Sequence, residues 1–599
     1  MTQARCGGTG QGASGGEARP YLTEVCVRVL GINAIFHDPA AAVAVDGEIV
    51  VAAEEERFTR RKHGKRPVPF SAWELPEQAA RWCLAGTGIG ADDLDAVAYS
   101  YDPSLVRPGQ GGAVPGHGAG RHGLGAGRKR PDPRWEGQDT EAPDWEGLRT
   151  MYARRAPRFL ASALPGLDPA KVVPVPHHVA HAASAGLAAP FGDCAVLVAD
   201  GRGEAASHLA GSYRGGELTV LASQELPHSL GLMYEEVTQH LGFQRSSDEY
   251  KVMALASYGK PRFLGELAEA VRATGDGGFV TEPVNWESMA RSRQPGEEWT
   301  QDHADLAASV QARLEEVLAD LARWLHERTG QRNLALAGGV ALNCVANTKL
   351  ASEGPFEHVW VQPAAGDAGT ALGGALELSR RAGLALTPMG DAGLGRVWED
   401  AQIEAALRAA AVPFTRPADL ADTVADALAR DQIVAWFQGR AEFGPRALGH
   451  RSLLAHPGRA GTIGRLNAVK GREQFRPVAP MVLADRAAEI FSRGPLPSPY
   501  MLFVHDVAPA WRDRIPAVVH VDGTARIQTV DPGSQPLLAS LLRSFTGRTG
   551  LPVLVNTSLN TAGRPMVDSP RDALECFGSA PLDVLAIGPF VVRRAGWRP

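Results

Sequence analysis

The sequence predicts an α/β protein with a larger N-terminal domain and a smaller C-terminal domain. A strand–turn–hairpin pattern occurs twice, with a spacing of 168 residues that separates Cys26 from Cys194 and Gly47 from Gly215. Downstream, apolar strand segments alternate with amphipathic helical segments, which is typical of α/β folds. Closely spaced Pro and Gly at 381–400 mark a boundary between the two domains.

Each half of the N-terminal domain begins with a strand followed by a hairpin. In the first half we expect the strand at residues 25–30, and Asp46-Gly47 is a favourable two-residue hairpin turn. In the second half a strand ends at Asp200 and a hairpin turns at Gly215. Two halves of this kind resemble the actin-like (sugar kinase/Hsp70/actin-type) ATPase fold, in which nucleotide lies in the cleft between the halves.

Composition divides the chain further. Residues 1–24 are polar and Gly-rich without the apolar core of a signal peptide, so we expect a disordered tail. Residues 25–390 form the actin-like domain, which carries an insertion at 103–147 with 11 Gly and 6 Pro and little periodicity. Residues 391–599 form a separate α/β domain. The clearest single elements are a helix at 308–329 and strands at 333–337, 433–437 and 552–558.

Charge and composition exclude several classes of protein. Lys and Arg number 61 against 67 Asp and Glu, a net charge of −6, whereas proteins that hold duplex nucleic acid are usually basic. No apolar run reaches the roughly 18 residues that span a bilayer. The six cysteines are scattered, without the close spacing of a disulfide framework or a zinc knuckle. We therefore expect a cytoplasmic protein with no nucleic-acid and no membrane partner.

The segment VPVPHHVAHAAS contains two histidines at the spacing of one helical turn. If a helix begins near His177, the side chains of His177 and His181 lie on one face, as in helical metal sites. The alternative is a polar helix start whose histidines cap the helix or face solvent. Asp200 and Asp367 follow strands whose ends would face a shared cleft, and two imidazoles with two carboxylates suit Fe²⁺, Mn²⁺ or Zn²⁺. His178 is a competing ligand.

Two glycine turns and one histidine are further candidates. Gly338-Gly339 and Gly366 each precede an apparent helix, so their backbone N–H groups are placed to receive a phosphate, although ordinary strand–helix turns look the same. His37 lies in the N-terminal turn, where it is either a general base or a histidine bonded to backbone. Lys62 belongs to a basic run that is either a solvated face or in reach of a bound anion.

The region 440–476 is the most specific. It contains eight Lys or Arg against two Glu, interspersed with Gly, Pro and apolar residues, which favours convergence on one pocket. Guanidinium groups bind phosphate oxygens in pairs, so a compact polyanion such as ATP fits this pattern. Arg526, Ser558 and Asn560 are candidate additional donors. The basic residues are Arg440, Arg446, Arg451, Arg459, Arg465, Lys470, Arg472 and Arg476.

Several long segments in fixed order resemble the O-carbamoyltransferases of antibiotic biosynthesis and nodulation. They are HDPAAAVAVDGEIVVAAEEERFTRRKHG, HHVAHAAS, DEYKVMALASYG, LAGGVALNCVAN, EFGPRALGHRSLLA and KGREQFRPVAP. The resemblance covers residues 25–599 apart from the insertion. It implies a larger domain similar to the threonylcarbamoyl-transferring ATPase of tRNA modification, and a smaller domain similar to the enzyme that makes threonylcarbamoyl adenylate.

The resemblance also implies a reaction. The smaller domain would make carbamoyl adenylate from carbamoyl phosphate and ATP, with Mg²⁺ accompanying ATP, and the larger domain would transfer the carbamoyl group to a hydroxyl of a natural product, as in antibiotic biosynthesis. A tRNA-modifying threonylcarbamoyl enzyme is the alternative, which the acidic balance and the fusion of both domains disfavour. A non-enzymatic ATP-binding module would leave the 440–476 region unexplained.

Site residues follow from the matching motifs. Four residues resemble the ligands of an Fe²⁺-type site, His37 the base that takes the acceptor's proton, and Asp248 a group that orients acceptor or base. The four implied metal ligands are His177, His181, Asp200 and Asp367. The residues implied near the adenylate are Lys62, Gly338, Gly339, Asn343 and Gly366. Those implied to bind ATP and carbamoyl phosphate are Arg446, Arg451, Lys470, Arg472, Arg476, Arg526, Ser558 and Asn560.

Overall fold

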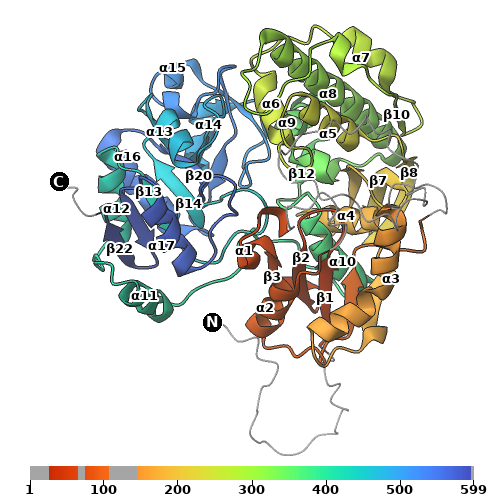
Figure 1. Ribbon diagram of the computed structural model, residues 1–599, viewed down its shortest axis with the longest axis horizontal. Coiled ribbons are helices and arrows are strands. Elements are labelled where there is room, and N and C mark those ends of the chain that lie inside the picture. The colour runs from red at the N-terminus through yellow and green to blue at the C-terminus, as the bar shows by residue number, and fades with distance from the viewer. Residues whose placement is uncertain (1–25, 65–73, 107–144, 595–599) are drawn as a thin grey trace, which may run out of the picture.

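The computed structural model describes residues 26–64, 74–106 and 145–594 (Figure 1). The expected tail at 1–24 and most of the insertion at 103–147 lie outside the described residues. Within the described part, no helix combines the length and the apolar character needed to cross a membrane.

The first half of the N-terminal domain is a five-stranded sheet in the order β3-β2-β1-β4-β5. Its hairpin turns at Asp46 and Gly47, whose φ angles of 51° and 85° suit the two-residue turn that the sequence predicted. Strands β1, β2 and β3 are antiparallel neighbours, and β4 and β5 are parallel to β1. The strands are β1 (Arg28–Asn33), β2 (Ala40–Val45), β3 (Glu48–Glu54), β4 (Ala96–Tyr99) and β5 (Val172–Pro174).

The second half repeats this plan. Its sheet has the order β12-β11-β6-β7-β8, in which β6, β7 and β8 are antiparallel neighbours and β11 and β12 are parallel to β6. Two sheets with the same order and directions form the actin-like fold, so the predicted fold class is confirmed. The strands are β6 (Cys194–Ala199), β7 (Ala206–Arg214), β8 (Glu217–Glu225), β11 (Asn333–Ala337) and β12 (His358–Val361).

Two helices lie between the sheets and contact each other. Helix α4 (His177–Gly186) packs on β6, β7 and β11, whereas α10 (Ala368–Arg381) packs on β1, β2 and β4. Their backbones approach closely, because a Cβ on Gly373 of α10 would lie 1.8 Å from the carbonyl oxygen of Ala180. This packing brings the ends of α4 and α10 together in the middle of the domain.

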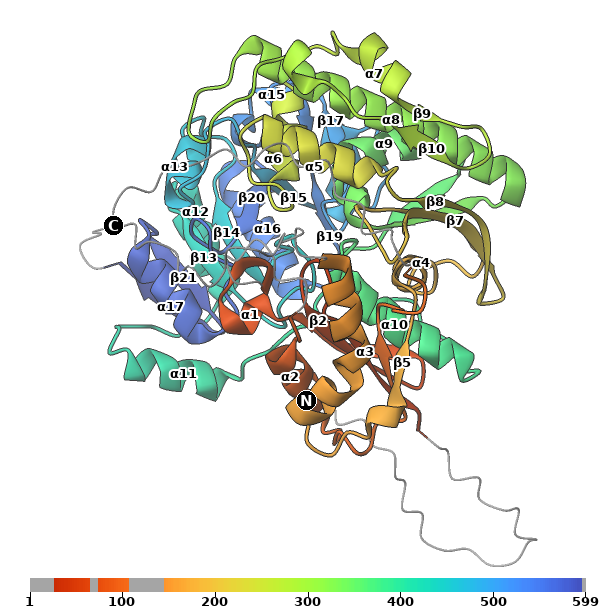
Figure 2. The same cartoon turned by 45° about the vertical axis from the view of Figure 1, so that its right-hand side comes forward.

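Of the remaining helices of the N-terminal domain, some pack directly on one of the two sheets and others pack on the long helix at 301–329 (Figures 1 and 2). The long helix predicted at 308–329 begins earlier, at Gln301, where Thr300 and His303 form a capping box. These elements are α1 (Glu56–Thr59), η1 (Lys62–Gly64), α2 (Glu77–Thr87), α3 (Trp145–Ala163), α5 (Leu230–His240), α6 (Glu249–Ala256), α7 (Leu264–Ala270), α8 (Gln301–Thr329) and α9 (Cys344–Glu353), with a small hairpin of β9 (Val271–Ala273) and β10 (Phe279–Thr281).

The C-terminal part contains a seven-stranded mixed sheet in the order β19-β15-β20-β14-β13-β21-β22 and a small sheet of β16, β17 and β18. Its largest core cluster consists of residues from Ile403 to Val592, separate from the clusters of the two halves. The strands are β13 (Val434–Phe437), β14 (Arg451–Ala455), β15 (Ala479–Leu483), β16 (Phe491–Ser492), β17 (His505–Val507), β18 (Thr524–Ala525), β19 (Gln528–Val530), β20 (Val553–Ser558), β21 (Val584–Ile587) and β22 (Phe590–Arg593).

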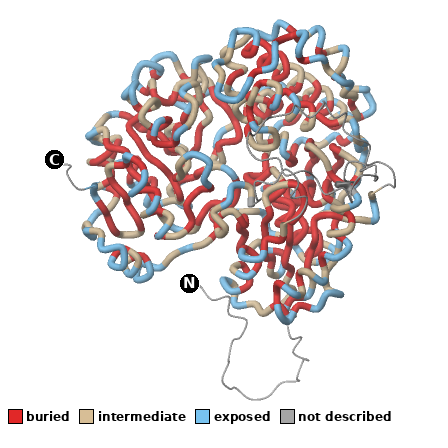
Figure 3. The backbone as a smooth tube through the Cα atoms, viewed as in Figure 1, coloured by how far each residue is buried: buried red, intermediate tan, exposed pale blue. Residues whose placement is uncertain are grey.

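The helices of this part are α11 (Asp400–Ala409), α12 (Leu420–Ala429), α13 (Thr462–Val469), α14 (Ala484–Ile490), α15 (Pro509–Arg512), α16 (Pro536–Thr549) and α17 (Pro570–Ser579). The predicted boundary at 390/391 falls between α10 and α11. Buried segments are concentrated in the interior of the molecule and exposed segments at its periphery (Figure 3).

A buried ion pair joins the two domains. Arg57 and Glu54 of the N-terminal domain are 2% and 6% exposed, and their side chains are 3.3 Å apart. Arg57 Nη2 donates to the carbonyl of Gly444 at 2.9 Å, and the Gly444 N–H donates to Glu54 at 2.7 Å. The loop that contains Gly444 is therefore held by the N-terminal domain.

Candidate functional site

Two histidines and two aspartates converge where α4 meets the ends of two strands. His177 and His181 begin α4, Asp200 follows β6, and Asp367 immediately precedes α10. One ligand atom from each of the four lies within 4.8 Å of all the others, and all four residues are buried. The separate distances from each Nε2 to a carboxylate oxygen are 3.5 to 3.7 Å. The structure thus brings together the four residues implied by the resemblance.

Neighbouring groups orient these ligands. Nδ1 of His177 lies 3.2 Å from the carbonyl oxygen of Ser100 and donates to it, which turns Nε2 toward the cluster. The N–H of Gly339 donates to Oδ1 of Asp200 at 2.8 Å. The N–H of His37 donates to Oδ2 of Asp367 at 3.0 Å. Each carboxylate thus keeps one oxygen for the centre of the cluster.

The cluster has the chemistry of a metal centre. The Nε2 atoms of His177 and His181 are buried and have no hydrogen-bond partner among the residues that the structure describes, which is costly unless a cation or proton occupies the space. Burial opposes charge here, but the opposite charges of the partners lower the pKa of Asp200 to about 2 and lower that of Asp367 as well. Two imidazole nitrogens and two ionised carboxylates fit a borderline divalent ion.

His178 lies beside this group. Its Nε2 is 3.9 Å from Oδ2 of Asp200, and it does not belong to the set of converging ligand atoms. Burial and the neighbouring His177 lower the pKa of His178 to about 3, so its imidazole is neutral. The structure therefore separates His178 from the two histidines that share a face.

The turn after β1 carries His37 to the edge of the same cluster. The Nδ2 of Asn33 donates to the carbonyls of His37 at 2.7 Å and Asp38 at 3.0 Å. His37 is connected to Asp367 by its backbone, and its ring lies 6.1 Å from the ring of His63. The base implied by the resemblance is thus next to the metal-type cluster.

Five cations gather in the C-terminal domain, and we call them the cation cluster: Arg446, Lys470, Arg472, Arg476 and Arg526. Arg476 and Arg526 both lower the pKa of Arg446 and of Arg472, which burial lowers first, to about 9 in each case. Burial, then Arg472 and Arg476, hold the pKa of Lys470 well below its ordinary value. The five side chains therefore lie close enough to one another for their charges to interact.

Lys470 connects the cluster to β20. Its Nζ donates to the carbonyl of Ser558 at 2.6 Å and to Oγ of Ser558 at 2.9 Å, and it also donates to the side chain of Asn560. Among the described residues, the cation cluster makes a single ion pair with a carboxylate, between Arg476 and Glu473 at 3.5 Å. The cluster is therefore a site of positive charge that a bound anion would neutralise.

The remaining cations of the 440–476 region do not join the cluster. The guanidinium of Arg451 is fully buried and donates to the carbonyls of Gln438 and Gly439 at 2.8 and 3.1 Å. Arg440 donates to the carbonyl of Val50, and Arg465 pairs with Asp431. The expectation of a single pocket for all eight cations was therefore too broad. Arg451 in particular organises backbone, and its implied role toward ATP remains a prediction.

The cation cluster reaches the glycine turn of the N-terminal domain. Nη2 of Arg446 lies 3.2 Å from the carbonyl oxygen of Leu342, in the turn that includes Gly338. The φ of Gly338 is 90°, and a Cβ there would lie 2.2 Å from the carbonyl oxygen of Ala199, so this position requires glycine. Asn343 caps α9, accepting from the N–H of Ala346 at 3.1 Å.

Tyr250 lies between the two domains, and the sequence analysis missed it. Its ring centre is 4.5 Å from Cζ of Arg476 and 6.0 Å from Nζ of Lys62. Its hydroxyl donates to Asp248 at 3.2 Å, and Asp248 also pairs with Lys251. The position of Tyr250 within the motif DEYKVMALASYG was the available signal.

Gly366 lies at the start of the turn before α10, where its carbonyl accepts from the backbone N–H three residues on.

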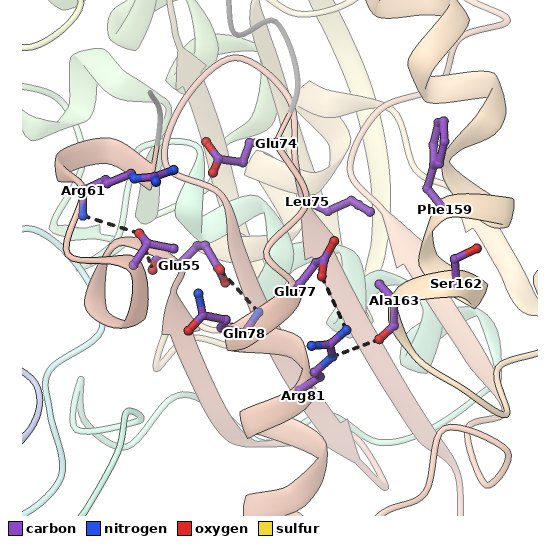
Figure 4. Close-up of a pocket in the computed structure, with 11 residues that line it drawn as sticks. Glu55, Arg61, Glu74, Leu75, Glu77, Gln78, Arg81, Phe159, Ser162 and Ala163 are labelled. Atoms are coloured by element: carbon purple, nitrogen blue, oxygen red, sulfur yellow. Dashed lines mark hydrogen bonds and ion pairs between the residues drawn. The ribbon is translucent and has the colours of Figure 1, made fainter. Parts of the chain in front are cut away.

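A surface cavity of about 600 Å³ lies elsewhere, between α2 and α3 (Figure 4). Its acidic side chains have structural partners: Glu55 accepts from the N–H of Ala79 at 2.8 Å, and Glu77 pairs with Arg81. None of the predicted site residues lines this cavity.

Known protein families match both the N-terminal and the C-terminal part of the chain. The family described as carbamoyltransferase N-terminus matches residues 28–107 and 161–376, and carbamoyltransferase C-terminus matches 425–594. The uncharacterized protein sll1178 of Synechocystis is 36% identical, over 94% of this chain and 96% of its own. Nodulation protein NolNO of Sinorhizobium fredii is 36% identical, over 94% of this chain and 80% of its own. Nodulation protein NolO of Bradyrhizobium diazoefficiens is 40% identical, over 70% and 78%.

Solved structures show more distant similarity. HypF of T. kodakarensis is 14% identical with a TM-score of 0.31, covering 60% of this chain and 48% of its own. Component A of the (R)-2-hydroxyglutaryl-CoA dehydratase of Acidaminococcus fermentans is 15% identical with a TM-score of 0.27, covering 60% and 99%. The family matches extend over most of the chain and over both domains. The chain therefore belongs to the carbamoyltransferase family, as its motifs predicted, and is a transferase enzyme.

Proposed function

We propose that this carbamoyltransferase is an ATP-dependent O-carbamoyltransferase that works in two steps. In the first, the C-terminal domain converts carbamoyl phosphate, water and ATP to carbamoyl adenylate, phosphate and pyrophosphate. In the second, the N-terminal domain transfers the carbamoyl group to a hydroxyl of a small-molecule natural product and releases AMP. A carbamoyl group is a poor electrophile, and a mixed anhydride with AMP gives it a good leaving group.

The hydrogen bond from Arg446 to the carbonyl of Leu342 is the observation that carries this proposal. Arg446 belongs to the cation cluster, whereas Leu342 lies three residues after Gly339, whose N–H holds Asp200 of the metal-type cluster. A site suited to phosphates and a site suited to a divalent ion are therefore connected through one short turn. An activated intermediate made at the first would be close to the second.

The cation cluster suits the first step. Guanidinium and ammonium groups bind phosphate oxygens and stabilise charge that develops during phosphoryl and adenylyl transfer. Because burial and then their like-charged neighbours lower the pKa values of Arg446 and Arg472, an anionic ligand would relieve repulsion as it binds. ATP with Mg²⁺, together with carbamoyl phosphate, supplies such anions.

The N-terminal cluster suits the second step. An alcohol is a poor nucleophile at neutral pH, and an imidazole near the acceptor takes up its proton as the carbonyl is attacked; we assign this role to His37. Asp248 holds Tyr250 and Lys251 in place beside the cation cluster. His177, His181, Asp200 and Asp367 would hold a divalent ion such as Fe²⁺. Such an ion polarises a carbonyl or neutralises a phosphate.

Isotope exchange tests the first step. We expect purified protein to exchange labelled pyrophosphate into ATP only when carbamoyl phosphate is present. Exchange without carbamoyl phosphate, or none with it, would contradict the proposal.

A mass-spectrometric screen tests the second step. With ATP and carbamoyl phosphate, hydroxylated metabolites are expected to gain one carbamoyl unit. If no metabolite is carbamoylated while tRNA binds in a filter assay and becomes modified, the tRNA-directed alternative replaces this proposal.

A further inference from the structure

Three side chains form a hydrogen-bonded chain that crosses between the two halves of the N-terminal domain. Nδ1 of His63, in η1, lies 2.8 Å from Oδ1 of Asp38, in the turn after β1. Nε2 of His63 lies 3.0 Å from Oγ of Ser247, which belongs to the other half, just before α6. A carboxylate only accepts hydrogen bonds, so Nδ1 of His63 carries the hydrogen. Both ring nitrogens of His63 are thus used.

The backbone is strained in all three segments that carry these hydrogen-bonded side chains. Phe36, Asp38, His63 and Ser246 all have left-handed φ angles, of 61°, 45°, 62° and 58°. Such conformations are unfavourable for side chains other than glycine and persist where the surroundings hold them. The described part of the chain contains ten non-glycine residues of this kind, and four of them lie on the three segments that meet at His63.

The strained turn carries His37. On one side, the His37 N–H is held by Asp367, and on the other, the next residue, Asp38, is held by His63. Glu56 in turn accepts from the backbone N–H of His63 at 2.7 Å. The turn that carries His37 is therefore connected through Asp38 and His63 to Ser247 in the opposite half.

We propose that His63 is a positioning residue for the transfer step: it clamps the turn of His37 to Ser247 across the cleft, so that His37 is in place only when the two halves are together. This inference rests on the proposed function for its catalytic readout. The order Asp–His–Ser is also that of a hydrolase nucleophile. However, a carbamoyl group on Ser247 would be an ordinary alkyl carbamate, whose leaving group is no better than that of the product, so the activation held in the adenylate would be lost.

Hydrogen exchange on the intact protein tests the clamp without any ligand. In Ser247→Ala, we expect the amides of residues 33–40 to exchange about five- to tenfold faster, the effect of losing one hydrogen bond, although Ser247 is far away in sequence. Ser247→Thr keeps the hydroxyl and should restore wild-type exchange. His358→Asn, at an exposed histidine of β12, is the matched control and should change nothing there. Unchanged exchange of residues 33–40 in Ser247→Ala would overturn the clamp.

The two half-reactions then separate positioning from general damage. His63→Asn keeps a donor toward Asp38, and His63→Gln keeps a group that reaches Ser247. Each should lower the turnover number of transfer from supplied carbamoyl adenylate about five- to tenfold, with pyrophosphate exchange unchanged. Equal loss in both half-reactions would show a structural role only and overturn the proposal. So would a carbamoyl unit found on Ser247 by peptide mass spectrometry.

Failure of the proposed function is distinguishable from failure of the clamp. If wild-type protein shows no carbamoyl phosphate-dependent pyrophosphate exchange, the adenylate reaction is wrong, whereas the hydrogen-exchange result still decides whether Ser247 and His63 hold the turn.

Discussion

The two charged regions of this molecule are built on opposite plans. Around His177, two imidazoles face two carboxylates, and despite burial the opposite charges raise the pKa of His177 and lower those of Asp200 and Asp367. In the cation cluster, like charges face one another, and burial together with repulsion lowers the pKa of Lys470 and of Arg472. The first region brings opposite charges together within the protein. The second becomes balanced only when an anion binds, which is why we regard it as the site where phosphate groups are handled.

The largest expected effects separate the regions by half-reaction. Lys470→Ala removes a donor to which we assign phosphate binding, so adenylate formation should fall about 10²- to 10³-fold, while transfer from supplied carbamoyl adenylate stays near the wild-type rate. His37→Ala should show the reverse pattern. Both rates are measured by pyrophosphate exchange and by AMP release. If both variants lose the same half-reaction, the division of labour between the regions is wrong.

Metal binding sharpens the description of the first region. His181→Ala removes one of four converging ligands, and we expect affinity for Fe²⁺ or Co²⁺ to fall by about 100-fold or more, measured by titration under anaerobic conditions. His178→Ala is the matched control on the same helix, because its ring lies outside the ligand set. Equal losses in the two variants would contradict the assignment.

Proton release checks the same region by pH. Burial alone would lower the pKa of His177, but Asp200 and Asp367 raise it well above 6.5, so the metal-free imidazole holds a proton at neutral pH. That proton stabilises the metal-free fold below pH 6.5, and the stabilisation is lost as pH rises through the raised pKa. Metal binding should therefore release about one proton at pH 7, measured by calorimetry in buffers of different ionisation enthalpy. Affinity that does not change with pH would contradict this.

The smallest effect concerns stability of the second region. Arg526 lowers the pKa of both Arg446 and Arg472, so Arg526→Met should relieve repulsion and raise the free energy of unfolding of the ligand-free protein by about 0.5–1 kcal/mol. The same change should abolish most of the rise in melting temperature that ATP gives the wild type. Arg430→Met, at an exposed helical pair with Asp426, serves as the control. A less stable ligand-free Arg526→Met protein would argue against uncompensated charge.

Much of the fold could be predicted because its signals are local. Asp46-Gly47 turned the first hairpin, and residues 333–337 formed the predicted strand without adjustment. The histidine pair could also be predicted, since the start of α4 at His177 places His181 one turn later. The convergence of Asp200 and Asp367 was an inference from strand ends, and it succeeded because both strands end at the same cleft.

The division of the basic region could not be predicted from spacing. Arg446 and Arg451 are five residues apart, yet one lies in the cation cluster and the other donates to the carbonyls of Gln438 and Gly439. The deciding factor is which backbone carbonyls each guanidinium meets in the folded protein, Leu342 for Arg446 and Gln438 and Gly439 for Arg451, and this is a tertiary property. Ser247 carried no pattern in the sequence either, because its partner His63 lies in a different half of the domain.

The buried contact of Glu54 and Arg57 with Gly444 has an evolutionary consequence. If the two domains were separate polypeptides, Glu54 and Arg57 would lose their hydrogen bonds to Gly444 whenever the domains came apart. The loop that precedes Arg446 would then lose the contacts that hold it. Two separate polypeptides would need an interface that is stable enough to keep this contact without a covalent connection. We therefore expect selection to have kept the N-terminal and C-terminal domains within a single gene.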